Sequence, residues 1–91
     1  MKKPYVPLKE LCAGIAEEAT ELAQAALKVA RIERRENPTP VPAHKAMQDV
    51  VEELADVAVV CDVIRLEPDR QIMMDKLKRW AERIEGGDGW N

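Results

Sequence analysis

Apolar side chains recur along the first third of the chain at separations of three, four and seven residues, which is the period of an amphipathic α-helix. The members of this stripe are Leu8, Leu11, Ile15, Leu22 and Val29. No proline interrupts the pattern before Pro38. We therefore predict a first helix over residues 8–36, about 40 Å long at ~1.5 Å per residue.

Three prolines at alternate positions, from Pro38 to Pro42, exclude a helix from the next segment. A second helix is predicted over residues 43–66. Its first half is amphipathic, but Asp62 is the only charged residue between Val57 and Ile64. A helix that is apolar on every face must be buried on every face. In a chain of 91 residues, we expect another subunit to supply that cover.

A third helix is predicted over residues 69–85, after Pro68, with Trp80 in its apolar stripe. The glycine-rich residues 86–91 should form a flexible tail. The expected architecture is a single all-α domain over residues 1–91, with three main helices per chain assembled into an oligomeric helical bundle. A small chain buries little core alone, which also favours a homo-oligomer, either a dimer or a tetramer.

Composition narrows the classes of partner. Aromatic residues make up 3% of the chain, so aliphatic residues must fill the core. A net charge of −3 argues against binding to a nucleic-acid polymer, which usually requires a basic excess. No apolar run is long enough to span a membrane, and we expect a soluble, cytoplasmic protein. Cys12 and Cys61 should then be reduced thiols in the core.

Two pairs of acids stand where apolar residues are expected. Glu18 lies on the apolar seam of the first predicted helix, and Glu21 follows three residues later. Glu53 and Asp56 repeat this spacing on the second helix, among valines and leucines. A buried carboxylate without a partner is costly. If the two helices pack antiparallel, the four acids can face one another across the seam.

Four carboxylates in one pocket require a hard cation, and an all-oxygen set of ligands favours Mg²⁺ or Mn²⁺ over zinc. The alternative is an ordinary solvated acidic face, because acids three residues apart are common in charged helical proteins. Basic residues such as Lys28 and Arg31 on a similar face could also neutralise these acids through salt bridges.

The residues around these acids resemble a known family. The segments 16–28, AEEATELAQAALK, and 51–57, VEELADV, are similar to the all-α nucleoside triphosphate pyrophosphohydrolases of the MazG type. The hallmark of that family is E-x-x-E on one helix and E-x-x-D on the next. The later segment 75–79, DKLKR, resembles a third family element, an acidic or amide residue followed by Lys and Arg. The resemblance covers about residues 11–79.

The resemblance implies a reaction and a set of roles. Glu18, Glu21, Glu53 and Asp56 would be the catalytic acids that hold Mg²⁺, one of them acting as the base for the attacking water. The products would be a nucleoside monophosphate and pyrophosphate. Asp75 would complete the metal shell. Phosphates would be bound by Lys76 and Arg79, with Lys28 as a further candidate.

Two other functions remain open. Phosphoribosyl-ATP pyrophosphohydrolase, from the same superfamily, shares the acidic motifs with a different substrate. A helical assembly or regulatory protein without catalysis would explain the long helices, but it would not explain an acid on an apolar seam. A carboxylate-bridged di-iron bundle requires E-x-x-H motifs, and the chain has none.

Overall fold

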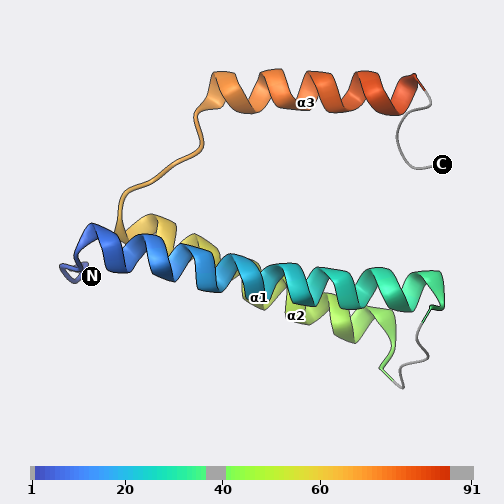
Figure 1. Cartoon of the computed structure of the whole chain (residues 1–91), viewed down its shortest axis with the longest axis horizontal. Helices are drawn as coiled ribbons and strands as arrows, with labels where there is room; N and C mark the ends of the chain where they lie inside the picture. The colour runs from blue at the N-terminus through green and yellow to red at the C-terminus, as the bar shows by residue number, and fades with distance from the viewer. Residues whose placement is uncertain (1, 37–40, 87–91) are drawn as a thin grey trace.

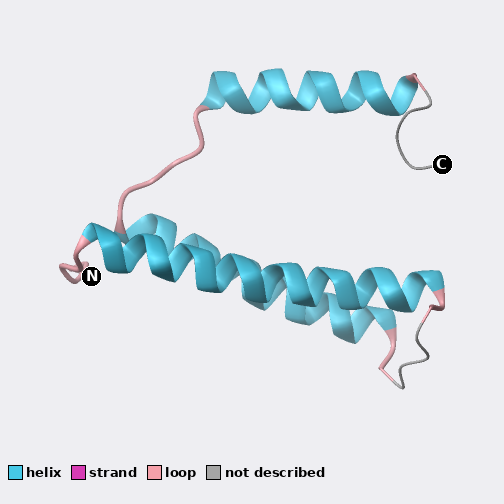
Figure 2. Ribbon diagram, in the orientation of Figure 1, coloured by secondary structure: helices cyan, strands magenta, loops and turns pink. Residues whose placement is uncertain are grey.

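The computed structural model describes residues 2–36 and 41–86. These residues form three helices and no strand: α1 (Leu8–Arg34), α2 (Ala43–Val63) and α3 (Arg70–Glu85) (Figures 1 and 2). The predicted all-α class and the three helices are confirmed. Of the predicted tail, residues 87–91 lie outside the described residues.

Helices α1 and α2 end earlier than predicted, at Arg34 and Val63 instead of residues 36 and 66, whereas α3 ends at Glu85 as predicted. In each case an arginine just beyond the helix adopts a left-handed conformation, with φ of 58° at Arg35 and 60° at Arg65. The following amide then donates back across the last turn, as Leu66 N does to the Cys61 carbonyl at 2.9 Å. This closing motif usually carries glycine at the left-handed position, so the sequence pattern did not reveal it.

The helices begin close to the predicted positions. Pro7 and Pro42 precede α1 and α2 in extended conformations. Asp69, predicted as the first residue of the third helix, is instead its N-cap, and its side chain accepts a hydrogen bond from Ile72 N at 2.9 Å. An aspartate at this position satisfies one of the unpaired amides of the first turn.

Helices α1 and α2 pack side by side and antiparallel (Figure 1). Their apolar residues are half-buried along the shared seam, and Ala46 is the one fully buried residue in the described part of the chain. Leu8, expected on the seam, is 68% exposed. At Gly14 an added Cβ would lie 3.6 Å from Val60 Cγ1, so the two backbones approach closely there.

Helix α3 lies apart from the α1–α2 pair and makes no contact with either helix within the described residues (Figure 1). Its apolar stripe, which includes Leu77 and Trp80, is therefore exposed. The chain exposes 7828 Å², whereas a compact monomer of 10.3 kDa exposes about 5,400 Å². The radius of gyration of 16.6 Å likewise exceeds the ~12 Å expected for a compact chain of this length.

Candidate metal centre

The antiparallel register of α1 and α2 brings the four predicted acids together. Gly14 faces Val60. Four residues forward on α1 and four residues back on α2, the same register sets Glu18 opposite Asp56. Three residues further, it sets Glu21 opposite Glu53. The two E-x-x-E/D spacings therefore meet at the middle of the helix pair, as the sequence predicted.

The ligand oxygens of these four acids lie within 4.8 Å of one another. A Mg²⁺ ion with ligands at about 2.0–2.1 Å places opposite oxygens ~4.2 Å apart, and a Ca²⁺ ion with ligands at about 2.3–2.6 Å places them ~4.6–5.2 Å apart. Side-chain movement of well under an ångström would thus close the cluster around either ion. The geometry fits a hard divalent cation.

The two acids on the seam, Glu18 and Glu53, each have a shielded oxygen without a hydrogen-bond partner among the described residues. Glu18 and Glu53 are half-buried, whereas Glu21 and Asp56 are exposed. In both Glu18 and Glu53, the oxygen that is shielded from solvent is Oε2. Shielded acceptors are normally satisfied, so these two oxygens point to a ligand between the helices.

The electrostatics of the cluster agree with this geometry. Burial raises the pKa of Glu18 above its usual 4.5, and the negative charge of Glu21 raises it further. Burial likewise raises the pKa of Glu53, followed by the charges of Glu21 and Asp56. The protein alone thus disfavours the charged form of both seam carboxylates, and a bound cation would reverse that preference.

No salt bridge within residues 2–36 and 41–86 neutralises the cluster. Among the described residues, the ion pairs are Lys3 with Asp62 at 3.1 Å and Arg34 with Glu36 at 3.8 Å. Both pairs lie near helix ends, away from the middle of the seam. The basic residues that the sequence offered as competitors, Lys28 and Arg31, form no ion pair with the four acids.

The remaining predicted site residues are not assembled with the acids in the single chain. Asp75, Lys76 and Arg79 lie on α3, which does not contact α1 or α2. Asp75 instead accepts a hydrogen bond from Gln71 Nε2 at 3.0 Å. Lys28 is half-buried on α1, about 10 Å along the helix from Glu21 at ~1.5 Å per residue.

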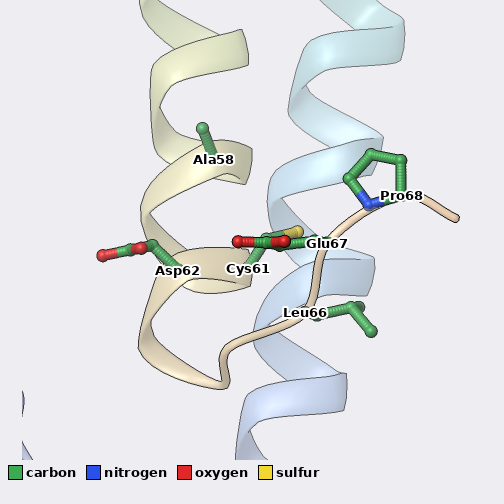
Figure 3. Close-up of a pocket in the computed structure, with 6 residues that line it drawn as sticks. All are labelled: Ala58, Cys61, Asp62, Leu66, Glu67 and Pro68. Atoms are coloured by element: carbon green, nitrogen blue, oxygen red, sulfur yellow. The ribbon is translucent and has the colours of Figure 1, made fainter. Parts of the chain in front are cut away.

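Among the hollows in the described part of the chain that lie outside the acidic cluster, two differ in character. One is mainly apolar and sits where the linker to α3 turns back beside the end of α2 (Figure 3). The other is on α3, and its lining residues are Lys76, Arg79, Trp80 and Arg83. Arg83 was not singled out by the family motif. Its spacing could have identified it, because Arg83 follows Lys76 by seven residues and Arg79 by four, which places all three on one face of a helix.

The cysteines differ from the prediction. Both are free thiols, but Cys12 is exposed and Cys61 is only half-buried, so neither belongs to a core within one chain. No helix in residues 2–36 and 41–86 combines the length and apolar character needed to cross a membrane.

Comparison with known proteins identified no relative: no family profile, curated protein or solved structure matches the chain.

Proposed function

We propose that this protein hydrolyses nucleoside triphosphates to a nucleoside monophosphate and pyrophosphate, with Mg²⁺ held by Glu18, Glu21, Glu53 and Asp56. The observation that carries the proposal is the pair of shielded, unpartnered oxygens on Glu18 and Glu53 inside a cluster of four acids. The MazG-type motif on the same four residues supports this interpretation. Mn²⁺ could replace Mg²⁺ in the same oxygen site.

Phosphoanhydride hydrolysis depends mainly on positioning and charge neutralisation. The bound cation would supply a Lewis acid that polarises the phosphate and lowers the pKa of water. The seam carboxylates Glu18 and Glu53 would orient that cation from two sides. The exposed acids Glu21 and Asp56 lie at the solvent side of the cluster, where a carboxylate can accept the proton of an attacking water.

Product analysis tests the reaction. Chromatography after incubation with Mg²⁺ and a panel of ribo- and deoxyribonucleoside triphosphates should show a nucleoside monophosphate and pyrophosphate. Diphosphate with orthophosphate would refute the assigned bond. Turnover of phosphoribosyl-ATP alone would favour the histidine-pathway enzyme of the same superfamily. No turnover of any of these substrates would favour an assembly protein.

We further propose that the chain functions as a homo-oligomer. Helix α2 carries a second apolar stripe besides the seam, and Val51 and Leu54 on it are more than half exposed. Leu77 and Ile84 on α3 are also exposed. The surface in excess of a compact monomer is about 2,400 Å², on the scale of an obligate interface. A second copy of the chain could cover both stripes.

Assembly of subunits would also bring the predicted site residues on α3 close to the four acids. The phosphate-binding candidates Lys76 and Arg79 cannot reach the four acids within one chain while α3 stands apart. An α3 that docks on another subunit would bury its apolar stripe and place these cations near a helix pair. A dimer and a tetramer both satisfy this requirement.

A further inference from the structure

Two apolar stripes that face solvent in the single chain have the same spacing. The outer stripe of α2 lies on a different face from the seam with α1, and its members are Met47, Val51, Leu54 and Ala58. The members of the α3 stripe are Met73, Leu77, Trp80 and Ile84. Both stripes advance by four, three and four residues, the alternation with which two helices pack along each other. Each stripe is about 16 Å long at ~1.5 Å per residue.

The two helices carry net charges of opposite sign. Helix α2 contains five acids and one lysine, a net charge of −4 with His44 neutral. Helix α3 contains five basic residues and three acids, a net charge of +2. Two copies of α2 would repel each other, and so would two copies of α3. Charge therefore favours a contact between α3 and α2 over a contact between like helices.

The linker between α2 and α3 carries α3 away from its own helix pair. After the left-handed Arg65, residues 66–69 form neither helix nor turn. Pro68 fixes its own φ and favours an extended conformation at Glu67. Within the described residues, α3 contacts neither α1 nor α2 (Figure 1). A helix held off its own chain by a stiff linker is available for exchange between two copies, which is a low-cost route to a dimer.

The outer stripe of α2 continues into an open hollow that a docked helix would cover. The hollow has a volume of about 610 Å³, and Ala58 and Cys61 line it from α2 (Figure 3). Leu66 and Pro68 line it from the linker. Covering these apolar walls would remove them from water, which is the main favourable term in association.

We propose that two copies of this chain exchange α3, so that the stripe of each α3 packs along the outer stripe of α2 in the other copy. The exchange is reciprocal, so it closes a two-fold dimer and covers both kinds of stripe in both copies. The surface in excess of a compact monomer, about 2,400 Å² per chain, is more than the ~800 Å² per partner of a specific interface. This inference rests on the proposed homo-oligomer and assigns its contact surfaces, but it requires neither metal nor catalysis.

Aspartate substitutions on the two stripes test the exchange. In light scattering, the wild-type chain should have the mass of a dimer or a larger oligomer. Leu54→Asp on α2 and Leu77→Asp on α3 should each reduce the mass to that of one chain, 10.3 kDa, because either change places a carboxylate against apolar residues. Gln48→Asp and Gln71→Asp add the same charge at exposed positions off the stripes and should leave the mass unchanged.

Mixing the two stripe variants identifies which helices meet. A mixed dimer keeps one contact between an unsubstituted α3 and an unsubstituted α2. An equimolar mixture of Leu54→Asp and Leu77→Asp should therefore form dimers at a concentration where neither variant does so alone. Far-UV circular dichroism should show equal helix content in all variants. If the aspartate variants lose helix, Leu54→Ala and Leu77→Ala take their place in the same mixing experiment.

The other outcomes overturn the exchange. Dissociation of Leu54→Asp alone would indicate that α2 packs on α2, and dissociation of Leu77→Asp alone would indicate that α3 packs on α3. Two monomeric variants that do not recover on mixing, or controls that dissociate as well, would also refute it. A wild-type monomer would refute the proposed oligomer itself. Because mass is measured without substrate, the exchange can hold even if the protein hydrolyses nothing.

Discussion

Replacing Glu18 by Gln tests whether the four acids form a cation site, because it removes one negative charge and nearly preserves side-chain shape. The Glu18 carboxylate belongs to a cluster whose ligand oxygens lie within 4.8 Å, and its Oε2 is shielded and unpartnered. Burial and then the neighbouring acids raise its pKa, so the charged form is disfavoured without metal. In EDTA, Glu18→Gln should therefore unfold at the same temperature as the wild-type chain or higher.

Metal should change that order. A ligand at a hundredfold excess over its Kd stabilises the folded state by about 2.7 kcal/mol, which raises the melting temperature by roughly 10–20 °C for a domain of this size. The cluster offers four carboxylates, and the variant keeps three. If that loss weakens binding about a hundredfold, the stabilisation falls to about 0.4 kcal/mol, or a few degrees.

Thermal melts with EDTA and with millimolar Mg²⁺ or Mn²⁺ measure both effects. Glu17→Gln is the matched control, because it removes the same charge from the adjacent, exposed position of α1. Its metal-induced shift should equal that of the wild type, and hydrolysis should fall steeply only in Glu18→Gln. If both variants respond to metal alike, Glu18 is not a ligand and the four-carboxylate site is refuted.

Three further predictions follow from the helix pair and its surface. In metal-free protein, the folded chain binds protons more readily than the unfolded chain at Glu18 and Glu53. Their contribution to stability is therefore fully present below the unfolded pKa of 4.5 and is lost as pH rises through the raised folded pKa. The melting temperature should rise as the solution is acidified toward that unfolded pKa, and a flat profile would contradict the raised pKa. Gly14→Ala places a methyl group in ordinary contact with Val60 and replaces a poor helix former by a good one. It should raise the free energy of unfolding by about 1 kcal/mol, or ~4–8 °C in thermal melts. A lower melting temperature would refute the register of α1 against α2. Val51 is 61% exposed in one chain and lies at the proposed interface between subunits, so Val51→Asp should lower the mass measured by light scattering. If the wild-type chain is itself a folded, stable monomer, the proposed oligomer is refuted.

The sequence alone determined the helices and the acids of the candidate site. Apolar period and proline breaks are local signals, so α1, α2 and α3 could be predicted to within a few residues. The C-terminal ends of α1 and α2 were missed by two or three residues, because Arg35 and Arg65 adopt a left-handed conformation that their residue type does not favour. The position of Glu18 on an apolar seam was also visible, because a helical period assigns each residue to a face.

Tertiary structure decided how the acids differ from one another. Helix packing shields the Oε2 atoms of Glu18 and Glu53, while Glu21 and Asp56 remain exposed. No spacing rule separates these two classes, because the outcome depends on the angle and register at which α1 meets α2. The close approach at Gly14 is part of that register.

Tertiary structure also decided which predicted residues stand together. The family resemblance implied that Asp75, Lys76 and Arg79 share one site with the acids, but α3 makes no contact with α1 or α2 within the described residues. The direction taken by α3 after the chain reverses at Arg65 is a long-range property, which periodicity does not encode. Within one chain, α3 carries a row of cations beside Trp80. The helical period alone brings Arg83 onto the same face as Lys76 and Arg79.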